Sequence, residues 1–133
     1  MNILFIIDPL PSLSAYKDTS VAMMQALQDR GHHICVALQS QLYLEGERVR
    51  ARVLPITIKR DADLHGQDWW QEGEPQTLAL ADLHAVVMRK DPPFDLEYLY
   101  STHLLDRAQA EGARVFNTGA AIRNHPEIGR AHV

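Results

Sequence analysis

Charged and hydroxyl side chains stand where the sequence predicts strand ends and the start of a helix. They are Asp8, then Lys17, Asp18 and Ser20, and then Arg89, Lys90 and Asp91. An arginine guanidinium can bind a carboxylate through two parallel hydrogen bonds, and a helix N-terminus offers N–H groups with no partner inside the helix. If the strands are parallel, all these side chains meet at one edge of the sheet, which would suit a small ligand bearing carboxylates.

A structural role accounts for some of the same residues. Arg89 can pair with Asp91 or Asp95, and Asp18 can cap the helix that follows it. Spacing alone does not choose between these roles and ligand binding.

Other catalytic and metal-binding patterns are missing from the sequence. It contains no glycine-rich phosphate loop, no paired cysteine motif and no His-Glu-x-x-His. The adjacent histidines His32 and His33 would point to opposite faces of extended chain, which disfavours a metal site. Cys35 lies in an apolar run and is expected in the core. We therefore predict no catalytic residue and no metal ligand.

The elements that must position the polar residues follow from the apolar patterns. Strands are predicted at residues 2–7, 33–38, 85–89 and 113–116, and helices at residues 19–30 and 96–111. Short apolar runs that alternate with helices predict an α/β fold with a mainly parallel sheet, because parallel strands are joined by crossover helices. The side chains expected to be buried in this sheet are Ile3, Phe5, Ile7, Val36, Val86, Met88 and Val115.

The second helix carries apolar residues at helical spacing, which predicts the face that it buries. They are Leu96, Leu99, Tyr100, Leu104 and Ala108, and Asp95 is the expected N-cap.

The middle of the chain has a different pattern. Residues 42–59 alternate between polar and apolar around Glu45-Gly46-Glu47, which predicts a β-hairpin on the rim of the sheet. Residues 60–76 are polar and predict a mobile surface excursion. Its tryptophans, Trp69 and Trp70, are expected to pack against the domain rather than to form an exposed binding platform.

Length and charge limit the classes of function. The 133 residues, 46% of them hydrophobic, suit one domain, and the run from Ile3 to Ile7 is too short to span a membrane. No basic leader precedes this run, so a cytoplasmic location is expected. The formal charge of −4 has no basic cluster, which argues against nucleic acid or an anionic membrane as a partner.

The eight residues from Met88 to Asp95 closely resemble the N-terminal domain of bacterial glutathione synthetases. Other segments agree in the same order: Asp8-Pro9, Lys17 to Ser20, Leu42 to Leu44, Leu80 to Leu83, Asn117 and Arg123. The resemblance covers residues 1–127 and implies a Rossmann-like, three-layer pre-ATP-grasp domain. It also implies Arg89 as a contact to a substrate carboxylate, with Lys17, Asp18, Ser20, Lys90 and Asp91 as further candidates.

Full-length members of that family join γ-glutamylcysteine to glycine, using ATP and Mg²⁺, by way of an acyl phosphate. Their ATP loops and metal carboxylates lie in later domains. The resemblance therefore implies that this chain stops before the ATP-grasp domain, binds neither ATP nor Mg²⁺, and is inactive alone. It also implies a homo-oligomer for the complete enzyme.

Residues 128–133 do not continue the resemblance and are expected to be a non-native tail with few tertiary contacts. Two other functions remain compatible with the sequence. One is a stand-alone α/β domain that binds a small carboxylate or a partner protein, and the other is the pre-grasp domain of a different ATP-grasp ligase.

Overall fold

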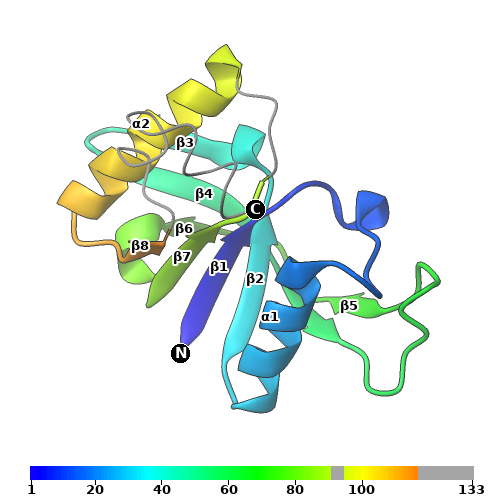
Figure 1. The fold of residues 1–133 in the computed structure, drawn as a ribbon. Helices are drawn as coiled ribbons and strands as arrows, with labels where there is room; N and C mark the ends of the chain where they lie inside the picture. The colour runs from blue at the N-terminus through cyan, green and yellow to red at the C-terminus, as the bar shows by residue number, and fades with distance from the viewer. Residues whose placement is uncertain (91–94, 117–133) are drawn as a thin grey trace.

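A parallel half-sheet forms the centre of the computed structural model, which describes residues 1–90 and 95–116 (Figure 1). Its strands are β1 (Asn2–Ile6), β2 (His33–Ala37), β7 (Ala85–Met88) and β8 (Val115–Phe116). They lie in the order β2-β1-β7-β8 and pair in parallel throughout. Helices α1 (Thr19–Asp29) and α2 (Leu96–Ala110) connect them, so the predicted strands, helices and α/β class are confirmed.

An antiparallel half extends the sheet beyond β2. Its strands are β3 (Leu42–Glu45), β4 (Arg48–Ile58), β5 (Trp70–Glu72) and β6 (Gln76–Ala79). The hairpin of β3 and β4 is confirmed, and Gly46 in its turn has φ +63°. The strand β4 does more than line the rim, because it also pairs antiparallel with β2, β5 and β6.

The expectation of a mobile excursion at residues 60–76 is wrong for its last part. Trp70–Glu72 forms β5, and Gln76 begins β6, both paired with β4. Trp69 is fully buried and Trp70 is half-buried, so the predicted packing of the tryptophans against the domain is confirmed. A polar strand without apolar alternation gives little signal in the sequence, because its pairing depends on a distant edge.

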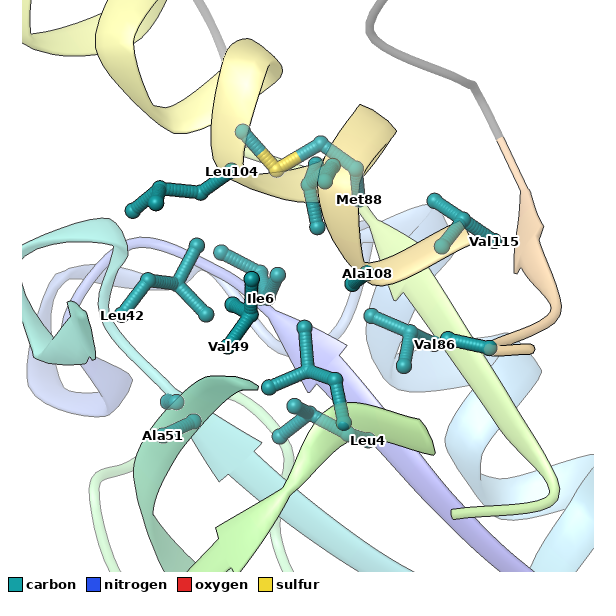
Figure 2. Packing of buried hydrophobic residues seen from close by; sticks show 14 of the residues in the cluster. Leu4, Ile6, Leu42, Val49, Ala51, Val86, Met88, Leu104, Ala108 and Val115 are labelled. Atoms are coloured by element: carbon teal, nitrogen blue, oxygen red, sulfur yellow. The ribbon is translucent and has the colours of Figure 1, made fainter. Parts of the chain in front are cut away.

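The helices cover opposite faces of the sheet, which makes three layers (Figure 1). Successive residues of β1 point to opposite faces, so Leu4 and Ile6 pack with α2 while Ile3 and Phe5 pack with α1. Figure 2 shows the α2 side, where Leu104 lies above the sheet. All seven side chains predicted to be buried in the sheet are buried: Ile3, Phe5, Ile7, Val36, Val86, Met88 and Val115.

The long strand β4 contributes to both cores. Val49, Ala51 and Val53 lie in the core beneath α2, and Ile56 and Ile58 lie in the core beneath α1. This is the period of two expected for one strand covered on both faces, with the odd positions on one face and the even positions on the other.

The predicted buried face of α2 is wrong at its first turns. Leu96 is 84% exposed and Tyr100 is 58% exposed, whereas Leu104 and Ala108 are buried as expected. The face that packs on the sheet is instead formed by Tyr98, Ser101, Thr102, Leu104, Leu105 and Ala108. Both patterns have helical spacing, and only contact with the sheet decides which of them is covered.

Three short 3₁₀ helices complete the described chain. They are η1 (Leu10–Ser12), η2 (Gln39–Gln41) and η3 (Leu80–Asp82). Neither α-helix within the described ranges is long and apolar enough to cross a membrane. The tail at residues 128–133 lies outside the described residues.

Candidate functional site

The order in which strands are added to the sheet changes direction at β1. After β1 the chain passes through α1 to β2, which pairs with one side of β1, whereas β7 pairs with the other side of β1. Loops that leave the carboxyl ends of two such strands turn away from each other and leave a crevice, which is where open α/β sheets bind ligands. The polar residues after β1 and β7 stand at this position.

A cleft of about 410 Å³ opens at this edge. Its walls come from the end of β1, the loop that follows it, the first turn of α1 and the residue after β7. The lining residues are Ile7, Asp8, Ser12, Leu13, Ser14, Lys17, Asp18, Thr19, Ser20 and Arg89. The predicted convergence of the strand ends and the helix start is therefore confirmed.

Arg89 is held at the wall of the cleft by its backbone and its side chain. Its N–H donates to the carbonyl oxygen of Ile6 at 2.8 Å, which continues the pairing of β7 with β1. Its Nε donates to the Oγ of Ser20 at 3.2 Å. Within the described residues Arg89 forms no ion pair, so Asp95 is not its partner; Asp91 lies outside them. The rest of its guanidinium can serve a ligand.

Asp18 caps α1, as predicted. Its Oδ1 accepts hydrogen bonds from the N–H groups of Ser20 at 2.7 Å and Val21 at 3.1 Å. This cap holds the first turn of α1 at the cleft, so that Ser20 is in position for Arg89. The capping role and the place in the cleft are thus compatible.

Lys17 precedes the cap and is exposed on the same wall of the cleft. Its Nζ lies 5.7 Å from the centre of the Tyr16 ring, and it forms no ion pair with any described residue. Tyr16 in turn stacks on His65, with ring centres 4.1 Å apart and planes 19° apart. The loop at residues 59–69 therefore braces the loop that carries Lys17.

Lys90 supports the cleft without lining it. Its Nζ binds the Oδ1 of Asp8 at 3.0 Å, and both side chains are largely covered, at 19% and 31% exposure. This pair joins the segment that follows β1 to the segment that follows β7 and holds Asp8 at the cleft. Asp91, the remaining candidate from the sequence, lies outside the described residues.

Three polar residues of the cleft were not among the sequence candidates. They are Ser12, Ser14 and Thr19, whose hydroxyl side chains line it. Asp8, which the sequence placed at this edge because it follows a buried strand, also lines the cleft. The serines carried no comparable signal, because hydroxyl groups are common in every loop.

Cys35 and the histidines add no chemistry to the cleft. Burial raises the pKa of the Cys35 thiol from 9.0 to about 12, so this thiol stays protonated in the α2-side core. In the portion of the chain that the structure describes, no three His, Cys, Asp or Glu side chains gather as a metal site would require. The cleft can hold a ligand through charge and hydrogen bonds.

The fold is an α/β domain with a polar cleft at the switch point of a partly parallel sheet. Comparison with known families gives a closer assignment. Residues 1–123 match the family described as "Prokaryotic glutathione synthetase, N-terminal domain". The chain belongs to this family, and the resemblance seen in the sequence is confirmed.

Similar proteins carry the name glutathione synthetase. The protein from Bordetella pertussis is 66% identical over 128 residues, which are 96% of this chain and 40% of the relative. That from Ralstonia nicotianae is 47% identical over 127 residues, which are 96% of this chain and 38% of the relative. That from Salmonella typhimurium is 36% identical over 119 residues, covering 90% of this chain and 36% of the relative. The chain spans about 40% of the first relative's length.

Proposed function

We propose that this domain forms the peptide-substrate side of the active site of a glutathione synthetase, with Arg89 as a contact to a carboxylate of γ-glutamylcysteine. In the complete enzyme, ATP and Mg²⁺ would be bound by the part that follows in the relatives, where the ligation to glycine would take place in the cytoplasm. Family membership supports the reaction, and the switch-point cleft supports the place. Residues 128–133 would be no part of the domain.

One observation carries the assignment to Arg89. Its guanidinium lies in the cleft, is oriented by Ser20 through Nε and has no carboxylate partner among the described residues. A half-buried arginine held in one orientation loses little conformational freedom when it binds a carboxylate. Lys17 adds a second cation to the same wall. The cleft is therefore prepared for a carboxylate.

Titration of the 133-residue chain with γ-glutamylcysteine under reducing conditions tests the proposal. We expect Arg89→Ala to raise the dissociation constant about tenfold to hundredfold, because a charged hydrogen bond contributes about 1.5–3 kcal/mol. Arg89→Lys keeps the charge but loses the planar fork, so its effect should be smaller. The matched control is Arg48→Ala, which removes an exposed arginine that pairs with Asp82 at 3.2 Å outside the cleft.

Melting temperatures of the same variants separate binding from folding. If Arg89 serves only the fold, Arg89→Ala will lower the melting temperature and leave the dissociation constant at the wild-type value. That result would remove Arg89 from the site. Adding ATP, Mg²⁺ and glycine to the chain should release no ADP, and ADP release would contradict the division of labour proposed here.

A further inference from the structure

One wall of the cleft is formed by residues 9–17, which we call the wall loop. The side chains that this loop adds to the cleft are Ser12, Leu13, Ser14 and Lys17. Among the described residues, the backbone hydrogen bonds of the loop close turns within it, as where the N–H of Lys17 donates to the carbonyl oxygen of Ser14 at 3.1 Å. Leu10 and Ala15 are buried, but the sheet gives the loop no backbone support. Side-chain contacts must therefore set its position.

The loop at residues 59–69, which we call the bracing loop, is closed at its base and anchored in the core (Figure 1). The N–H of Lys59 donates to the carbonyl oxygen of Trp69 at 2.9 Å, and the Lys59 side chain forms an ion pair with Asp68. Trp69 is fully buried in the core beneath α1, against which Leu64 also packs. The bracing loop is thus held in place without any help from the wall loop.

A tight turn in the bracing loop presents His65 to the wall loop. The Oδ1 of Asp63 accepts a hydrogen bond from the N–H of His65 at 3.0 Å, and its carbonyl oxygen accepts one from the N–H of Gly66 at 3.1 Å. The ring of His65 stacks on the ring of Tyr16, with centres 4.1 Å apart. Tyr16 directly precedes Lys17 in the chain. The stack therefore joins the anchored loop to the neighbour of a cation in the cleft.

This stack lies at the surface rather than in the core. Tyr16 is 51% exposed, and His65 is exposed as well. Neither residue lines the cleft. Removing one ring leaves the packing of Trp69 and Ala15 untouched, so its main effect should fall on the position of the wall loop. A stacked pair of rings can shift such an equilibrium about twofold to tenfold.

We propose that His65 is a positioning residue, which holds the wall loop through its stack on Tyr16 so that Lys17 can reach a ligand in the cleft. The identity of that ligand rests on the proposed function. When only one position of a loop completes a site, the apparent affinity falls with the fraction of molecules in that position. Loss of the stack should therefore raise the dissociation constant of γ-glutamylcysteine about twofold to tenfold.

Hydrogen exchange of the wall loop tests the coupling without a ligand. In the 133-residue chain, His65→Ala should speed amide exchange in a peptide spanning residues 9–17 about twofold to tenfold, because the turns that protect these amides open more often. Exchange in β1 should keep its wild-type rate. His65→Phe retains a ring that can stack and should restore both exchange and binding. The matched control is Gln67→Ala, an exposed residue of the same loop outside the stack, which should change neither.

A double-mutant cycle tests whether the two rings act through each other. Tyr16→Ala should match His65→Ala in exchange and in the dissociation constant, and the double variant should be no worse than either single variant. Asp63→Ala removes the turn that presents His65 and should act in the same direction with a smaller effect. Additive effects of the two ring substitutions, or equal acceleration of exchange in β1, would overturn the inference.

The outcomes distinguish this inference from the proposed function. If Arg89→Ala weakens binding of γ-glutamylcysteine but His65→Ala does not, the substrate site stands and the positioning role of His65 is wrong, whether or not exchange becomes faster. If the wild-type chain does not bind γ-glutamylcysteine, the proposed function fails. Exchange then still decides the coupling of the two loops, and an unchanged rate in His65→Ala would refute it.

Discussion

Removing the cap of α1 by Asp18→Ala should destabilise the domain measurably. The substitution leaves the N–H groups of Ser20 and Val21 without the carboxylate that accepts them at 2.7 and 3.1 Å. Loss of an N-cap costs about 0.5–2 kcal/mol in general. Ser20 is only 6% exposed and Val21 is fully buried, so water replaces the lost acceptor poorly. We therefore expect the upper half of the range, about 1–2 kcal/mol.

Thermal unfolding followed by circular dichroism measures this loss. For a chain of 133 residues, an unfolding entropy of about 2.1 cal/mol/K per residue converts 1 kcal/mol into about 4 °C. The melting temperature of Asp18→Ala should thus fall by about 4–7 °C. Asp18→Asn should lose much less, because its amide oxygen can accept the same bonds.

The other helix supplies a matched control. Asp95 caps α2 through a single hydrogen bond from the N–H of Tyr98 at 2.8 Å, so Asp95→Ala should cost less than Asp18→Ala. An unchanged melting temperature for Asp18→Ala would refute the reasoning that this cap holds the first turn. A loss as large for Asp18→Asn as for Asp18→Ala would show that charge, rather than capping, stabilises α1.

Two further predictions concern the core beneath α2. Because the pKa of Cys35 is raised from 9.0 to about 12 on folding, its contribution to stability is complete below pH 9 and is lost as the pH rises toward 12. Between about pH 8.5 and 10.5, the free energy of unfolding measured in urea should therefore fall by about 1–2 kcal/mol less for Cys35→Ala than for wild type. Parallel pH profiles for the two proteins would contradict this. At neutral pH, Leu105→Ala should lower the free energy of unfolding in urea by about 2–5 kcal/mol, because Leu105 is fully buried. Leu96→Ala should change it by no more than about 0.5 kcal/mol, since Leu96 is 84% exposed. Similar losses for the two variants would refute the observed buried face of α2.

Local sequence signals determined the parallel half of the fold. The apolar runs of β1, β2 and β7 are short and continuous because both of their faces are covered, and that pattern is readable without knowing the partners. The caps Asp18 and Asp95 were readable for a similar reason, since a cap binds N–H groups only two or three residues away. Family membership was readable from the run that begins at Met88, and the family match confirms it.

Contacts between distant segments decided the rest. The β5 strand exists because β4 offers it an edge, and α2 buries Tyr98 rather than Leu96 because of where the helix meets the sheet. The cleft itself is of this kind: Arg89 meets Ser20 across 69 positions in the chain, and Lys90 meets Asp8 across 82. The sequence named most of these side chains because strand ends and helix starts are local features. The distances between them exist only once β1 and β7 lie side by side, because pairing through the backbone sets those positions and no local pattern encodes them.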